Sequence, residues 1–186
     1  HLAPDLYCIA AIWIFKRFGG CTDVQLQFVP AGTTLNNLPV DSDPQVVHVD
    51  TGLGRFDHHQ RHVRTLSAAE LVRRMVAPHD PILERVVKQV TLIDNAISMD
   101  CQGCDMGRLA DSFNLLHENE PSRVVELMLP NLDAWYAHEL RQQQIGESYV
   151  NRIEFQSPWG RGMAMQSQFG GSASLADRKS TRLNSS

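Results

Sequence analysis

The chain has 186 residues and a formal net charge of −4, and hydrophobic residues make up 42% of it. These values are typical of a folded globular protein and exclude a broad basic surface for nucleic acid, although not a local basic patch. No apolar run approaches the ~20 residues that a membrane-spanning helix needs, and four cysteines do not make a disulfide framework at this length. We therefore expect a cytoplasmic protein with no membrane partner.

The first third of the chain alternates between helical and extended patterns. Residues 6–18 are apolar almost throughout and close with two basic residues before Gly19, which predicts a buried helix. Residues 23–30 alternate apolar and polar side chains, which predicts a strand with one wet face. After a loop over residues 31–44, the apolar run 45–50 predicts a buried strand that delivers Asp50 at its carboxyl edge.

Helical patterns dominate the middle of the chain. Ser67 with Glu70 three positions later is a capping box, so we expect a helix to about Val76. Pro81 favours the start of a second helix that reaches Asp94. Further helices are expected over residues 106–117 and 121–145, the last of them kinked or split at Pro130. Residues 152–155 and 162–165 have the pattern of two short strands.

This order predicts an α/β fold with a mostly parallel sheet flanked by helices, because a strand before His1 would complete a β-α-β unit. We expect an α/β domain over residues 1–118, a helical linker over 119–150, and the truncated start of a second α/β domain over 151–176. Residues 177–186 are polar and basic, and we expect a non-native or disordered tail there. The chain then has the look of a fragment cut at both ends.

Four clusters carry side chains that could perform chemistry. They are His1 with Asp5, then Asp50, then the triplet Asp57, His58 and His59, and finally Asp94. Carboxylates and imidazoles that converge at the end of a strand form a site for divalent metals such as Mn²⁺ or Zn²⁺. Each cluster also has a plainer interpretation, since Asp5 beside a proline could only cap a helix and a histidine pair on a loop is usually solvated.

The order and spacing of these clusters resemble the DHH phosphoesterase superfamily. The run over residues 49–60 and the later Ile93, Asp94 and Asn95 look more like its MYG1-like branch. The likeness is close over residues 1–100, and over residues 120–170 it is limited to the general character of the sequence. It implies a DHH-type domain, a two-metal site and hydrolysis of phosphate esters.

Carried onto this chain, the resemblance implies a role for each matching residue. One metal would be held by His1 and Asp5, a second by His58 and Asp94, and Asp50 would bridge them. The ions would be Mn²⁺, with Mg²⁺ or Zn²⁺ as alternatives, and His59 would be the catalytic residue that faces the phosphate. The family pattern has Asp where this chain has Tyr7, which would weaken the second metal site.

Three other features are less specific. Arg55 and Arg61 flank the triplet and would either bind a substrate phosphate or be solvated loop residues. Cys101 and Cys104 have zinc or redox spacing but lack a second pair, so two free thiols on a loop are the plainer interpretation. Trp135 and Tyr136 fit a helix core better than a base-stacking platform.

We therefore expect a metal-dependent phosphoesterase that acts on nucleotide-like phosphodiesters, with a nucleotide or short oligonucleotide as its substrate partner. One alternative is a degenerate, non-catalytic relative that binds a metal or a nucleotide, and Tyr7 favours it. Another is a MYG1-like exonuclease or a metal-dependent hydrolase of a different bond.

Overall fold

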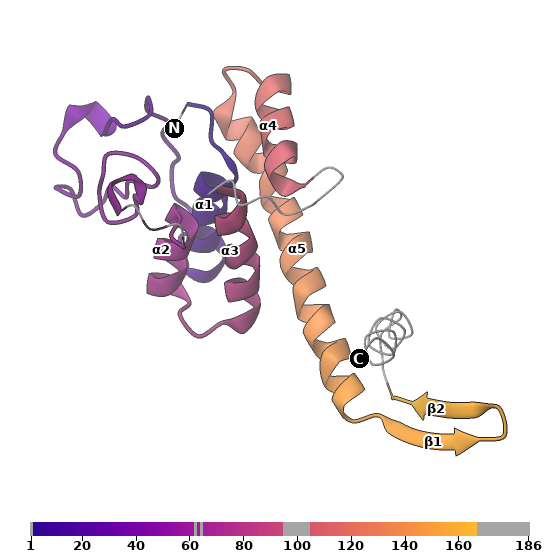
Figure 1. Cartoon of the computed structure of the whole chain (residues 1–186). Coiled ribbons are helices and arrows are strands. Elements are labelled where there is room, and N and C mark those ends of the chain that lie inside the picture. Colours follow the sequence, from indigo (N-terminus) through magenta and orange to yellow (C-terminus); the bar gives the residue numbers. More distant parts are fainter. Residues whose placement is uncertain (1, 62, 64, 95–104, 167–186) are drawn as a thin grey trace. The chain divides into compact units, whose positions relative to one another are not determined.

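A computed structural model describes residues 2–61, 63, 65–94 and 105–166 (Figure 1). These residues form the helices α1 (Leu6–Phe18), α2 (Ala68–Val76), α3 (Pro81–Asp94), α4 (Met106–Leu116) and α5 (Pro121–Val150), and the strands β1 (Ile153–Ser157) and β2 (Gly160–Ala164). The chain divides into two compact units after Tyr136, within α5.

The predicted helices are confirmed. Their starts were predictable because capping residues close in the sequence determine where a helix begins. The carboxylate of Asp5 accepts a hydrogen bond from the backbone N–H of Cys8, and Ser67 does the same for Glu70. Asp105 caps α4 through the backbone N–H of Arg108. Helix α5 differs from the prediction, since it continues through Pro130 to Val150 without a split.

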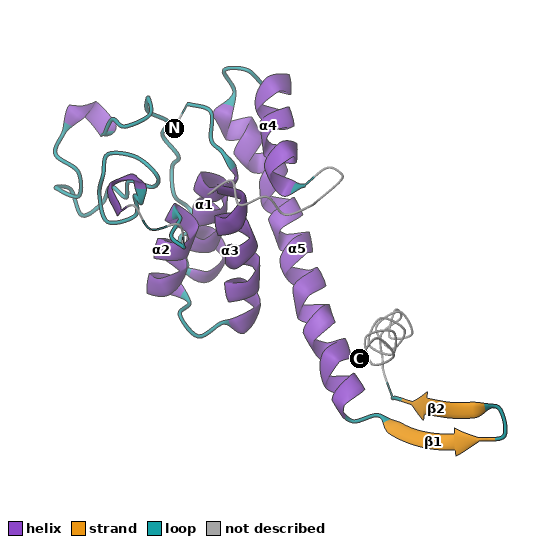
Figure 2. Cartoon of the chain, in the orientation of Figure 1, coloured by secondary structure: helices purple, strands orange, loops and turns teal. Residues whose placement is uncertain are grey.

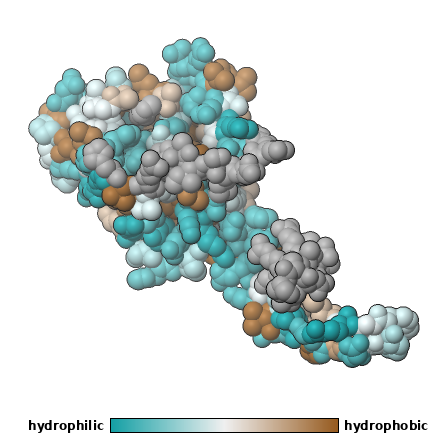
Figure 3. All heavy atoms as spheres, viewed as in Figure 1, coloured by the Kyte–Doolittle hydropathy of each residue, from teal (hydrophilic) through white to brown (hydrophobic). Residues whose placement is uncertain are grey.

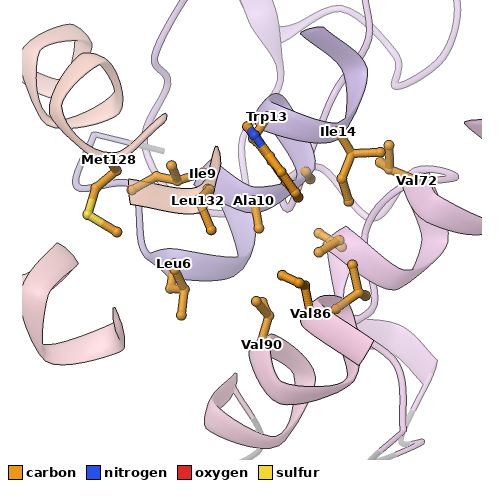
Figure 4. Close-up of a cluster of buried hydrophobic side chains, with 14 of the residues drawn as sticks. Leu6, Ile9, Ala10, Trp13, Ile14, Val72, Val86, Val90, Met128 and Leu132 are labelled. Carbon is orange, nitrogen blue, oxygen red and sulfur yellow. The ribbon is translucent and has the colours of Figure 1, made fainter. Parts of the chain in front are cut away.

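The core of the first unit is built around α1, which packs against α2, α3 and α4. Ile9, Ala10 and Ile14 are fully buried, in keeping with a helix that is apolar on most sides. Val86 and Val90 of α3 and Met128 and Leu132 of α5 belong to the same cluster (Figure 4). Burial of these side chains, at about 25 cal/mol per Å² of apolar surface, drives the assembly of the unit.

Shortening a side chain at the centre of this core should destabilise the fold. Ile9 is fully buried on α1, so Ile9→Ala should lower the free energy of unfolding by about 2–5 kcal/mol. The matched control is Ile153→Ala on β1, where the side chain is 69% exposed and the expected change is within about 0.5 kcal/mol. Urea denaturation followed by circular dichroism measures both, and equal losses would contradict this account of the core.

The expected mostly parallel sheet is wrong. The only sheet among the described residues is the antiparallel pair β1–β2. The two short strands predicted over residues 152–155 and 162–165 are therefore confirmed, but they form a hairpin and not the start of an α/β domain. Figure 2 shows loop along nearly the whole segment between α1 and α2, where two strands were predicted. Within that segment a single parallel bridge joins Val49 to Phe56.

The alternation of apolar and polar residues over 23–30 reflects a half-buried segment, and this segment pairs with no strand. Leu26 and Phe28 pack against the core while Gln25 and Gln27 are exposed, as the pattern predicted, but Val24 at the start of the run is exposed as well. A ladder needs a neighbouring strand for its backbone groups. Residues 24–29 and 45–49 instead line a groove of about 470 Å³ beside α1, and no ladder joins them.

The second unit carries the hairpin, in which Ile153 pairs with Ala164 and Ser157 with Gly160. Figure 3 shows hydrophobic side chains at the surface where the end of α5 meets the hairpin, and Val150 and Ile153 are exposed there. Trp159 at the hairpin turn is also exposed. None of the described helices is both long enough and apolar enough to cross a membrane.

Candidate metal centre

A tight loop over residues 50–57 places the carboxylate of Asp50. The backbone N–H of Asp50 donates to the carbonyl of Phe56 at 3.0 Å, and Asp50 itself has a φ of +57°, which Asp tolerates better than most residues. Gly52 has a φ of +76°, and a Cβ there would lie 2.7 Å from the Cγ2 of Thr34. The loop thus needs glycine at this position to bring residues 57–59 back beside Asp50.

Asp50, His58 and His59 converge as potential metal ligands. One donor atom from each lies within 4.8 Å of the others. The Nε2 of His58 is 3.5 Å from the Oδ1 of Asp50, and the Nδ1 of His59 is 4.0 Å from it. Atoms that bind one ion at about 2.0–2.2 Å must lie about 3–4 Å from each other, so the Asp50–His58 separation fits a shared ion.

The chemistry of Asp50 also fits a cation. Its residue is 2% exposed, and within the described part of the chain its Oδ1 accepts no hydrogen bond. A buried carboxylate oxygen without a hydrogen bond is costly unless another positive or donor group compensates it. A divalent ion between Asp50 and His58 would supply that compensation.

Asp5 adds a second, half-buried carboxylate near Asp50. Burial, and then the negative charge of Asp50, raises the pKa of Asp5 to about 6, although hydrogen bonds from Cys8 and Tyr7 act in the opposite direction. Burial and the same two carboxylates raise the pKa of the Cys8 thiol, which keeps it protonated. Asp5 therefore both caps α1 and lies within the electrostatic reach of Asp50, so the two sequence interpretations of this residue are compatible.

The raised pKa of Asp5 predicts a pH dependence of stability for the metal-free chain. Between about pH 4 and 6 the folded state holds a proton on Asp5 that the unfolded state has released, since the ordinary pKa is 3.8. The free energy of unfolding should therefore fall as the pH rises through this window, by at most about 1.4 kcal/mol per pH unit. Urea denaturation at pH 4.5, 5.5 and 6.5 should show the trend in the parent, and Asp5→Asn should reduce it. An identical pH profile in the variant would contradict the assignment.

Asp57 holds His59, a role that the sequence analysis did not assign although it placed Asp57 in the triplet. Its Oδ1 accepts hydrogen bonds from the backbone N–H of His59 at 3.0 Å and from the ring Nδ1 at 2.7 Å, and its Oδ2 accepts from the backbone N–H of Leu53 at 2.8 Å. Burial raises the pKa of Asp57, but these hydrogen bonds outweigh it and the pKa lies below its usual range. The signal available in the sequence was the spacing of Asp57 two residues before His59.

Tyr7 is the position at which the resemblance led us to expect an acidic ligand. Its ring meets the ring of His58 edge-on, with centroids 5.9 Å apart. Its hydroxyl donates a hydrogen bond to the carboxylate of Asp5. A side chain at position 7 therefore contacts both a residue expected at the first metal and one expected at the second.

The remaining predicted site residues are not brought to this cluster by any described contact. The backbone N–H of Arg55 donates to Asp41, and its guanidinium lies over the ring of Phe56. Arg61 is exposed at the end of a short 3₁₀ turn. Asp94 is the last residue of α3, and its side chain lies outside the described set, as do His1, Cys101 and Cys104.

Comparison with known proteins adds no assignment. No protein-family model matches the chain, and no match was found among curated proteins or solved structures.

Proposed function

We propose that this protein binds a divalent metal ion through Asp50 and His58 and hydrolyses nucleotide-like phosphodiesters. The observation that carries the proposal is the separation of 3.5 Å between the buried carboxylate of Asp50 and the Nε2 of His58, with the ring of His59 beside them. A second carboxylate, Asp5, lies close enough to Asp50 for their charges to interact. Mn²⁺ is the ion we expect, and the imidazole of His58 also suits Zn²⁺.

The side chains divide the work of such a reaction. A divalent ion, when bound, would lower the pKa of a water molecule and would stabilise the negative charge that develops on the phosphoryl group. Asp50 and His58 would hold that ion, and Asp5 would add charge balance beside it. His59 is 55% exposed, so its ring can meet a phosphate that approaches from solvent. We propose nucleotides or short oligonucleotides as substrates and the cytoplasm as the compartment.

A second candidate function is metal binding without turnover, and Tyr7 is the observation that favours it. A neutral phenol, with a reference pKa of about 10, is a poor ligand for a hard cation. If a second ion is needed for hydrolysis, its site lacks one carboxylate in this chain.

Isothermal titration with Mn²⁺ and with Zn²⁺, followed by hydrolysis of bis(4-nitrophenyl) phosphate, tests both functions. We expect one bound ion per chain and slow turnover that a chelator abolishes. Binding without turnover would favour the second candidate. Failure to bind either ion would overturn both. A 5′-labelled trinucleotide assayed in parallel would reveal exonuclease activity.

A further inference from the structure

The carboxylate of Asp57 is fixed from two sides before any substrate arrives. The backbone N–H groups of Leu53 and His59 donate to different oxygens of this carboxylate, at 2.8 and 3.0 Å. Asp57 is 1% exposed, so water does not compete for these hydrogen bonds. A buried carboxylate anchored by two backbone donors is a rigid acceptor.

This anchored carboxylate determines which ring nitrogen of His59 is engaged in a hydrogen bond within the protein. The Nδ1 of His59 lies 2.7 Å from the Oδ1 of Asp57. An ionised carboxylate can only accept hydrogen bonds, so Nδ1 must carry the proton and donate it. The other ring nitrogen, Nε2, remains for an external partner, and the half-exposed side chain allows one to approach.

The same contact separates His59 from the ion-binding pair. The Nδ1 of His59 is the atom that approaches Asp50, at 4.0 Å, and Asp57 already occupies it. His58 has the shorter separation from Asp50, 3.5 Å through its Nε2. The rings of the two histidines lie against each other, with centroids 4.6 Å apart, so His59 is beside the candidate metal position and not within it.

We propose that Asp57 is a positioning residue, which through Nδ1 of His59 fixes the ring so that Nε2 is the nitrogen presented to a substrate phosphate. The substrate contact rests on the proposed function, whereas the hold of Asp57 on the ring does not. Partners that orient a metal-binding histidine typically contribute about 10–100-fold to activity, and we expect a loss of similar size for this substrate-facing ring.

The orientation is tested by long-range ¹H–¹⁵N spectra of the metal-free protein at pH 8.5, with His59→Gln used to assign the signals. In the parent, Nδ1 of His59 should be protonated and Nε2 unprotonated. In Asp57→Asn and Asp57→Ala the population of this tautomer should fall. A parent ring protonated at Nε2, or a tautomer unchanged in both variants, would overturn the proposal.

The kinetic test uses whichever of the parent and Tyr7→Asp turns over bis(4-nitrophenyl) phosphate faster. Asp57→Asn should lower kcat about 10–100-fold, with little change in KM or in Mn²⁺ affinity by titration. In a His59→Gln background the same substitution should lower kcat no further, because Asp57 acts through that ring. Equal losses of kcat in both backgrounds would overturn the proposal, since they would indicate a structural role.

The two tests separate the proposal from the function on which it rests. If no variant hydrolyses a phosphodiester, the proposed function and the substrate contact of His59 both fall, and the spectra still report whether Asp57 orients the ring. If turnover is present but the tautomer is insensitive to Asp57, the function stands and the positioning role falls.

Discussion

Asp50→Asn will abolish binding of the divalent ion and with it all metal-dependent turnover. The variant removes the charge of a carboxylate whose Oδ1 lies 3.5 Å from His58 and 4.0 Å from His59, while keeping its shape. Loss of an outer partner typically lowers metal affinity about 10–100-fold, and loss of a direct ligand should lower it further. Asn also tolerates the φ of +57° at this position, whereas Asp50→Ala should add backbone strain of about 1–2 kcal/mol.

The stability of the metal-free variant gives this prediction a second readout with the opposite sign. Asp50 is buried, its Oδ1 accepts no hydrogen bond in the described part of the chain, and its charge acts on Asp5. Removing that charge should leave the free energy of unfolding unchanged or raised. Titration with Mn²⁺ and urea denaturation measure the two effects, with the exposed Asp23→Ala as the control. Full ion affinity in Asp50→Asn would refute the assignment.

The helices could be predicted from the sequence because their signals are local. Asp5 and Ser67 cap helices through hydrogen bonds to backbone N–H groups three residues on, and Pro81 is the first residue of α3, a position that favours proline. The two short strands β1 and β2 could be predicted as well, and they pair with each other across a short turn. The strands predicted over residues 23–30 and 45–50 are absent, because extended structure needs a partner that the local pattern does not name. Val24 and Leu26 alternate with glutamines as a strand does, yet the backbone there joins no ladder.

The candidate site likewise has a part that depends on local sequence and a part that depends on tertiary packing. Asp50, His58 and His59 lie within ten residues of one another, so a single glycine-containing loop is enough to bring them together. Asp5 reaches the same place only because α1 packs beside that loop, which the order of clusters suggested but the spacing alone did not require. The role of Asp57 depends on the orientation of the His59 ring, which the spacing of these two residues allows but does not specify.

Tyr7→Asp should let the chain bind a second ion and should raise its turnover. The phenol now contacts the ring of His58 and donates a hydrogen bond to Asp5, so a carboxylate at this position would lie between residues expected at the two metals. Two ions that share carboxylates can activate a water and clamp the phosphoryl oxygens together. Titration with Mn²⁺ should give one ion per chain for the parent and two for the variant.

Without metal the same substitution should destabilise the fold. A third carboxylate adds repulsion at a place where the charge of Asp50 already raises the pKa of Asp5, and the hydrogen bond from the phenol is lost. Saturating Mn²⁺ should reverse that loss, because an ion that binds only the folded state stabilises it by about 2.7 kcal/mol at 100 times its Kd. The matched control is Tyr7→Asn, which has the size of the variant without its charge and should gain neither ion nor turnover. If the parent and Tyr7→Asp both bind two ions and turn over equally fast, the second metal needs no ligand at position 7. If Tyr7→Asn shows the same gains as Tyr7→Asp, the cause is removal of the phenol and not the new carboxylate.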